Sequence, residues 1–124
     1  MVASDLVPVF TENFSNNLES LRDFLGVEGR SAFEHLLDRL FDDIVPTICR
    51  FPMSGRTLLQ RPIQSIETET RVKQIQQLLR PGDELREFIV DEYIVLYMKR
   101  SRRLLFLAIK HHRQLSFEFN QFWA

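Results

Sequence analysis

Residues 85–110, LREFIVDEYIVLYMKRSRRLLFLAIK, decide the fold class of this 124-residue chain. They contain three runs rich in leucine, β-branched and aromatic residues, at 85–90, 93–98 and 104–110. Asp91-Glu92 separates the first two runs, and Lys99 to Arg102 separates the last two. Short polar interruptions between runs of this composition are typical of hairpin turns, so we predict a three-stranded antiparallel meander.

The sequence before the meander predicts one strand and two helices. Val7 to Phe10 has the composition of a short strand, and Thr11 is placed to cap the helix that follows. The apolar residues at helical spacing in that helix are Phe14, Leu18, Leu21 and Leu25. Gly26 and Gly29 then bracket a break, so the two helices form an antiparallel helical hairpin.

The second helix has a start signal and an internal proline. Ser31 and Glu34 have the spacing of a capping box, in which each side chain bonds the backbone of the other end of the turn. Its apolar stripe consists of Phe33, Leu37, Leu40, Phe41, Ile44 and Ile48. Pro46 is expected to kink or shorten this helix because it lacks an amide hydrogen.

These elements predict one α+β domain over residues 1–124. An N-terminal strand precedes a helical hairpin that packs on one face of a small antiparallel sheet, in the order β-α-α-β-β-β. Residues 51–56 form a turn, and residues at about 57–84 form a helical or loop insertion. The tail carries Phe117, Phe119, Phe122 and Trp123, which are expected to dock on the core or on a partner.

The charges divide the chain into an acidic and a basic part. The net charge is −1, so no overall basic field attracts nucleic acid. Residues 1–45 carry nine acidic and three basic side chains, and the remainder carries 13 basic and eight acidic ones. Residues 99–113 hold six Lys or Arg side chains and no acid. This run indicates an anionic partner, or else a solvated turn that discourages aggregation.

Cysteine usage and hydropathy predict a cytoplasmic protein that does not enter a membrane. Cys49 lies in an apolar run and is interpreted as a buried hydrophobic residue in a reducing compartment. Met1 to Phe10 has an acid and no basic residue, unlike a secretory signal. The longest apolar stretch, Leu104 to Ile109, is far shorter than the ~20 residues that span a bilayer.

No motif for a cofactor or a metal is found. The four glycines do not form a phosphate-binding loop or a dinucleotide fingerprint. His111 and His112 are adjacent on a predicted strand and point to opposite faces, so they cannot chelate one metal. We therefore expect no metal and no cofactor.

Two interpretations remain for the polar residues of the meander. Arg86 shares a strand face with Phe88 and Val90, and Tyr93 shares one with Tyr97. Arginine, histidine and tyrosine together can cleave RNA, because cations hold the phosphorane oxygens while a base and an acid move protons. Alternatively, the two tyrosines are half-buried strand aromatics and Arg86 is a cation at the sheet edge.

Taken in order, the motifs of the chain resemble a known superfamily. They are VPVFTENF at 7–14, SAFEHLLDRL at 31–40, FPMSGR at 51–56, LREF at 85–88, YIVLY at 93–97 and IKHHR at 109–113. This series is similar to the RelE/ParE superfamily of bacterial toxins from type II toxin–antitoxin modules. The match covers roughly residues 5–56 and 85–113, and residues 57–84 and the aromatic tail are additions to it.

The resemblance implies one of two activities, since RelE-like members are ribosome-dependent mRNA endonucleases and ParE-like members inhibit DNA gyrase. RelE-like enzymes usually carry an arginine where this chain has Ile94. A related group uses a glutamate, which does not closely follow residues 51–56 here, and ribosome-directed members are strongly basic. These departures favour a ParE-like, non-enzymatic toxin that acts on DNA gyrase and replication. The alternatives are an mRNA endonuclease that blocks translation and a non-toxic member that serves only as a protein-binding module.

The resemblance also implies a cognate antitoxin as partner, and no membrane or small-molecule cofactor. The candidate residues for binding the target or antitoxin are Arg56, Arg86, Lys99, Arg100, Arg102, Arg103, His112 and Arg113. If the chain is a nuclease, Arg86 and Arg113 would hold the phosphate, and His111 or His112 would be the acid or base, with Tyr97 nearby.

Overall fold

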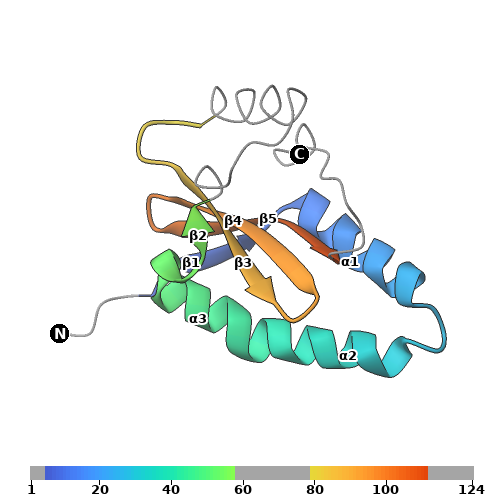
Figure 1. Cartoon of the computed structure of the whole chain (residues 1–124). Coiled ribbons are helices and arrows are strands. Elements are labelled where there is room, and N and C mark those ends of the chain that lie inside the picture. Colours follow the sequence, from blue (N-terminus) through green and yellow to red (C-terminus); the bar gives the residue numbers. More distant parts are fainter. Residues whose placement is uncertain (1–4, 58–78, 112–124) are drawn as a thin grey trace.

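The computed structural model describes residues 5–57 and 79–111, and it shows an α+β arrangement (Figure 1). The first half consists of a strand, β1 (Val7–Phe10), and the helices α1 (Glu12–Leu25), α2 (Arg30–Arg39), η1 (Leu40–Ile44) and α3 (Val45–Arg50). The single-turn helix η2 (Pro52–Ser54) and the strands β2 (Arg56–Thr57), β3 (Glu84–Val90), β4 (Tyr93–Arg100) and β5 (Arg103–His111) follow.

The predicted meander is confirmed and lies within a five-stranded sheet of order β1-β5-β4-β3-β2. β3, β4 and β5 pair antiparallel, and β2 pairs antiparallel with β3. β1 pairs parallel with β5, so the sheet is mixed rather than antiparallel throughout. The helices that follow β1 carry the chain to the far edge of the sheet, where β2 begins, and β1 covers the edge that β5 would otherwise leave open (Figure 1).

The strand boundaries differ from the predicted ones at the turns. Lys99 and Arg100 belong to β4 and Arg103 to β5, so the basic turn contains only Ser101 and Arg102. Asp91 and Ser101 adopt positive φ angles of 51° and 57°, the conformation that tight hairpin turns require. Thr57 lies in β2 and Glu84 in β3, so the predicted insertion is too wide at both ends. Its middle, 58–78, and the tail, 112–124, lie outside the described residues.

Helix α1 takes the place of a strand along β5. Thr11 caps α1 as predicted, because its Oγ1 accepts a hydrogen bond from the Phe14 amide. β1 pairs with β5 only as far as Phe106, which leaves the backbone beyond it without a strand on that side. The buried Asn13 donates to the Leu107 carbonyl at 2.8 Å, and Asn17 accepts from the Ile109 amide at 3.1 Å. These side chains satisfy backbone groups that would otherwise be buried and unpaired.

The second helix starts differently from the prediction, and it continues past Pro46. It begins at Arg30 behind Gly29 with no side-chain cap, so the predicted capping box at Ser31 is wrong. Pro46 neither ends nor breaks it, since helical turns continue to Arg50. Instead the turn before the proline is a π-helix, Leu40–Ile44. A wider turn at this point accommodates the missing amide hydrogen and the bulk of the ring.

The helices pack on one face of the sheet, as predicted (Figure 1). The buried residues of the helical layer include Leu36, Leu40, Ile44 and Ile48, and Phe41, expected in the stripe, is exposed. Spacing at every fourth residue rotates around a straight α-helix, and the wider π turn returns these side chains to the same face. Cys49 is buried as expected, and burial raises the pKa of its thiol. A second cluster, Leu85, Leu96, Met98, Leu107 and Ala108, lies on the opposite face of the sheet.

Candidate functional site

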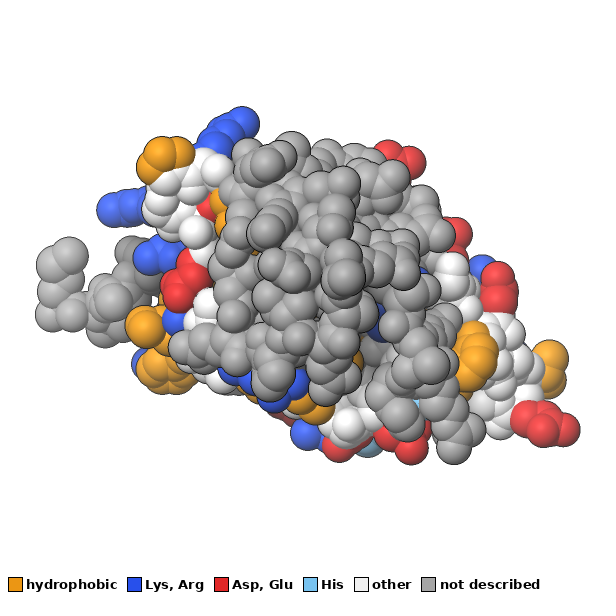
Figure 2. Space-filling view, turned by 45° about the horizontal axis from the view of Figure 1, so that its top comes forward, with side chains coloured by type: hydrophobic (Ala, Val, Ile, Leu, Met, Phe, Trp, Pro, Cys, Tyr) orange, Lys and Arg blue, Asp and Glu red, His pale blue; other side chains and the backbone are white. Residues whose placement is uncertain are grey.

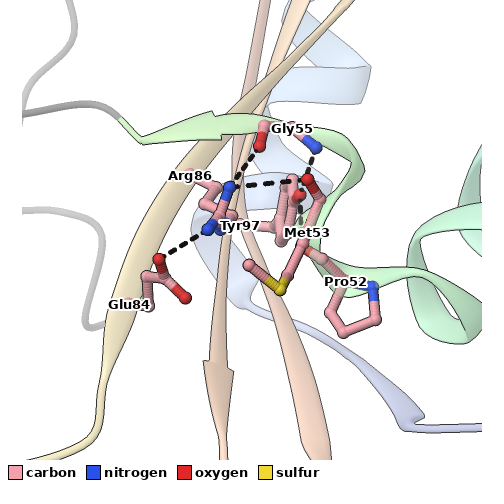
Figure 3. A network of polar contacts seen from close by, with 6 residues as sticks. All are labelled: Pro52, Met53, Gly55, Glu84, Arg86 and Tyr97. Carbon is pink, nitrogen blue, oxygen red and sulfur yellow. Dashed lines mark hydrogen bonds and ion pairs between the residues drawn. The ribbon is translucent and has the colours of Figure 1, made fainter. Parts of the chain in front are cut away.

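The segment after α3 is a compact turn fastened to the centre of the sheet (Figure 3). The prediction of a turn at 51–56 is confirmed for 51–55: Pro52 opens the short helix η2, and the Ser54 amide donates to the Phe51 carbonyl at 2.9 Å. Arg56 already belongs to β2, where it lies opposite Glu87. We call Phe51 to Gly55 the anchored turn.

Tyr97 fastens the anchored turn to β4 through its hydroxyl group. Its hydroxyl donates to the Pro52 carbonyl at 2.7 Å and accepts from the Gly55 amide at 2.8 Å (Figure 3). The side chain is fully buried, and desolvation raises the pKa of the Tyr97 phenol. The phenol therefore stays protonated at neutral pH and bonds to backbone atoms, so it is a structural group in this arrangement.

Arg86 fastens the same turn from the neighbouring strand. It lies opposite Tyr97 in the β3–β4 ladder and donates through Nη1 to the Gly55 carbonyl. Its Nη2 donates to Glu84 at 2.6 Å (Figure 3). The residue is 9% exposed, and its Nε is buried without a hydrogen-bond partner in the part of the chain that the structure describes. Arg86 lies between β2 and β4, so it is not a cation at the sheet edge.

Gly55 is required by the closeness of the turn to the sheet. A Cβ at this position would lie 2.5 Å from the Glu87 carbonyl oxygen and 2.6 Å from the Tyr97 hydroxyl. A Cβ atom does not approach other heavy atoms this closely, so any side chain would push the turn away from both strands. The Gly55 φ angle is an ordinary −80°, so packing rather than backbone conformation explains the glycine.

Arg56 and Glu87 form an ion pair on the opposite face of the sheet from Tyr97. The Glu87 side chain is fully buried, whereas that of Arg56 is half exposed. The Arg56 Nε donates to Glu87 Oε1. A buried carboxylate needs such partners, because an ion that loses water without compensation is strongly destabilised. Arg56 thus has a structural contact and still reaches solvent.

Among the described residues of the predicted basic run, Arg100 is paired and the cations next to it in the chain are exposed. Arg100 makes a two-pronged contact with Asp83, at 3.1 Å from Nε and 2.6 Å from Nη2. The hydrogen bond from Arg100 is the largest cause of the lowered pKa of Asp83. Lys99, Arg102 and Arg103 are exposed around the β4–β5 turn. Those three remain accessible to a partner.

His111 lies far from Arg86 and Tyr97. It is buried at the end of β5, with Nε2 at 3.0 Å from Glu92 and its ring edge-on against Tyr93. His111 pairs with Tyr93 while Arg86 pairs with Tyr97, so four residues of β4 separate the two positions. At ~3.3 Å per strand residue the two backbone positions are about 13 Å apart, and each side chain is held by other partners: Gly55 and Glu84 for Arg86, and Glu92 for His111. His112 and Arg113 lie outside the described residues.

Three contributors to this site were not predicted from the sequence. They are the close approach at Gly55, the carboxylate of Glu87 and the unpaired Nε of Arg86. A glycine after a Pro-Met-Ser sequence was a visible signal for a tight turn, but its contacts are 31 to 42 residues away along the chain. The described residues contain no group of three or more side chains able to hold a metal, and none of their helices is both long and apolar enough to span a bilayer.

Comparison of the sequence with known proteins identifies its family. No curated protein sequence matches the chain. A family model described as the ParE toxin of the type II toxin–antitoxin system parDE matches residues 9–116, which include every described element except the first two residues of β1. The chain therefore belongs to the ParE toxin family of type II toxin–antitoxin systems, as the RelE/ParE resemblance of its motifs predicted.

Proposed function

We propose that this toxin arrests bacterial growth by binding DNA gyrase in the cytoplasm, and that it does not cleave RNA. Family membership makes the chain a toxin that is paired with a cognate antitoxin protein. The observation that supports binding to gyrase over RNA cleavage is the structural role of Arg86 and Tyr97. Both are buried and bonded to backbone carbonyl groups of the anchored turn, at a distance from His111.

A nuclease of this fold would need those groups to converge on a phosphate. A general base must come within hydrogen-bond reach of its proton, and cations must face the charge that develops in the transition state. In the described part of the chain, the terminal nitrogens of Arg86 donate to Gly55 and Glu84, and the proton of Tyr97 is directed at Pro52. An inhibitor that acts by binding has no such geometric requirement.

The test is to induce the chain without its antitoxin and to follow DNA and protein synthesis separately by pulse-labelling. We expect DNA synthesis to fall first, and a host with a toxin-resistant gyrase to continue growing. The variant His111→Ala should arrest growth as the wild type does, provided that it accumulates to the same level. An early fall in protein synthesis that His111→Ala relieves would overturn the proposal in favour of an mRNA endonuclease. Continued growth with both syntheses intact would leave a protein-binding module.

A further inference from the structure

The anchored turn exposes large apolar side chains on a rigid support. Phe51 is 59% exposed and Met53 is 74% exposed. The guanidinium of the preceding Arg50 lies 5.7 Å from the centre of the Phe51 ring, in a cation–π contact. Phenylalanine, methionine and arginine are the types that are enriched where protein partners bind. Together these side chains form a projecting anchor, which we define as Arg50, Phe51 and Met53.

The anchor is held in place by groups that are costly to bury. Tyr97 and Arg86 contribute hydrogen bonds to the turn's backbone at Pro52 and Gly55, and Gly55 allows the turn to sit against β3 and β4. The buried Nε of Arg86 has no partner in the described residues, a loss that an apolar residue would avoid. A fixed turn binds a partner with a smaller loss of conformational entropy than a mobile one does.

Exposed cations lie beside the helix end that carries the anchor. The Leu6 amide donates to the Cys49 carbonyl, and the next amide, Val7, donates to the Arg102 carbonyl. These two bonds place the end of α3 beside the β4–β5 turn, which carries the exposed Lys99, Arg102 and Arg103. Figure 2 shows basic and hydrophobic side chains, with acidic ones between them, along the left edge of the molecule, the edge where α3 and this turn lie in Figure 1.

The acids near this end are largely engaged. Asp83 is bound by Arg100 and Glu84 by Arg86, which leaves Asp5 as the exposed acid beside the end of α3 among the described residues. The helical layer, by contrast, carries eight acids and three arginines between residues 11 and 43. A segment that brings both negative charge and apolar side chains is therefore attracted to the anchor and repelled by the helices.

We propose that the anchor is a docking point for an acidic, amphipathic segment of the cognate antitoxin. Phe51 and Met53 enter the apolar side of that segment, while Arg50, Arg102 and Arg103 pair with its carboxylates. Tyr97 and Arg86 are positioning residues, because they touch the turn rather than the partner. This inference rests on the family membership of the chain, and it does not depend on which cellular target the toxin has.

The test titrates full-length toxin variants with the purified cognate antitoxin. Replacing both apolar anchors, in Phe51→Ala/Met53→Ala, should weaken binding by at least about tenfold, as expected for central interface side chains. The matched control is Val27→Ala, because Val27 is 93% exposed on the loop between α1 and α2. That variant should bind within about twofold of the wild type. Raising the salt concentration should weaken wild-type binding more than binding by Arg102→Ala/Arg103→Ala.

The positioning role is tested by Tyr97→Phe, which removes a hydroxyl that no partner can reach. Affinity should fall, and adding Phe51→Ala/Met53→Ala to Tyr97→Phe should cost less than the product of the separate effects, because the anchor is then already displaced. The control Tyr93→Phe removes a hydroxyl on the same strand face and should leave affinity unchanged. Each variant is first shown to be folded by its unfolding transition.

Two results would overturn the proposal. One is wild-type antitoxin affinity in Phe51→Ala/Met53→Ala, whatever its toxicity. The other is additive effects of Tyr97→Phe and the anchor substitutions. Growth arrest is scored separately: a variant that binds antitoxin normally but no longer arrests growth would assign the anchor to the target, whereas failure of the gyrase proposal alone would leave antitoxin affinities as predicted.

Discussion

The two ends of the β3–β4 hairpin use the same kinds of residue in different ways. At the open end, Asp83, Arg86 and Tyr97 are almost completely withdrawn from solvent, and their bonds hold the anchored turn or the chain before β3. At the turn end, Asp91 pairs with Arg39 and Glu92 with His111, but both carboxylates are more than half exposed. The comparison shows that a tyrosine or arginine in a family motif acquires its role from burial and bonding partners rather than from its type.

A buried polar bond is far costlier to break than an exposed one, so the difference in exposure predicts a difference in stability. Removing one partner of a buried pair leaves the other desolvated and unpaired, whereas water replaces a lost partner at the surface. Substitutions at the open end should therefore cost much more stability than matched substitutions at the turn end.

The largest expected effect is that of Gly55→Ala. The added methyl group would collide with the Glu87 backbone and the Tyr97 ring, and relieving the collision breaks the hydrogen bonds of both Tyr97 and Arg86 to the turn. We expect a loss of about 2–3 kcal/mol in the free energy of unfolding, measured by urea denaturation. Met53→Ala, on the exposed side of the same turn, is the control and should cost little. Equal stability of Gly55→Ala and the wild type would contradict the close approach.

The next effect is the difference between Tyr97→Phe and Tyr93→Phe. Tyr97→Phe leaves the Gly55 amide without an acceptor and the Pro52 carbonyl without a donor, so it should cost about 1–3 kcal/mol. Tyr93→Phe should change the free energy of unfolding by less than about 0.5 kcal/mol, since Tyr93 is only partly buried. The same denaturation curves measure both values. Similar losses for the two variants would remove the distinction between the two ends.

The contribution of Asp83 to the free energy of unfolding should depend on pH. The hydrogen bond from Arg100 is the largest cause that holds the folded-state pKa of Asp83 below its ordinary value of 3.8. The unfolded chain therefore takes up this proton first as the pH falls, so the stabilising contribution is present above pH 3.8 and is lost as the pH falls through the folded-state value. In Asp83→Asn this acid-side loss should be absent. The free energies of unfolding of wild type and variant should differ by a constant amount above about pH 5 and converge in acid.

The smallest effect is expected for Arg39→Ala. Arg39 and Asp91 are both about half exposed, so their ion pair should contribute only about 0.2–1 kcal/mol and should weaken as salt is added. Denaturation at low and high salt measures this. A loss as large as that of Tyr97→Phe would show that the turn end is held as firmly as the open end.

Most of the fold could be predicted because its signals are local. Runs of leucine, β-branched and aromatic residues and the short polar interruptions between them specify the meander from neighbouring positions alone, and Val7–Phe10 was predicted with the observed bounds. The parallel pairing of β1 with β5 was not predictable in this way, because it joins residues about 96 positions apart and depends on how α1 covers β5. The π turn had a signal that was missed, namely the spacing of Leu36, Leu40, Ile44 and Ile48 at every fourth residue.

The site was less predictable than the fold. Sequence alone placed Arg86 and Tyr97 on neighbouring strands, but it did not predict that they lie opposite each other, as the register shows. It could not show that the turn at 51–55 closes over them, because that contact depends on where α3 ends above the sheet. Glu87 directly follows the charged Arg86, so nothing local indicates that its side chain is buried, and its ion pair with Arg56 joins two different strands.

The most direct test of the central claim uses purified DNA gyrase, relaxed plasmid and the purified chain. If Arg86 and Tyr97 are structural and the toxin acts by binding, the wild type should inhibit supercoiling in proportion to its concentration, and an equimolar amount of antitoxin should restore it. His111→Ala should inhibit equally well. Supercoiling that is unaffected by a preparation that still arrests growth would contradict the account and direct attention back to RNA.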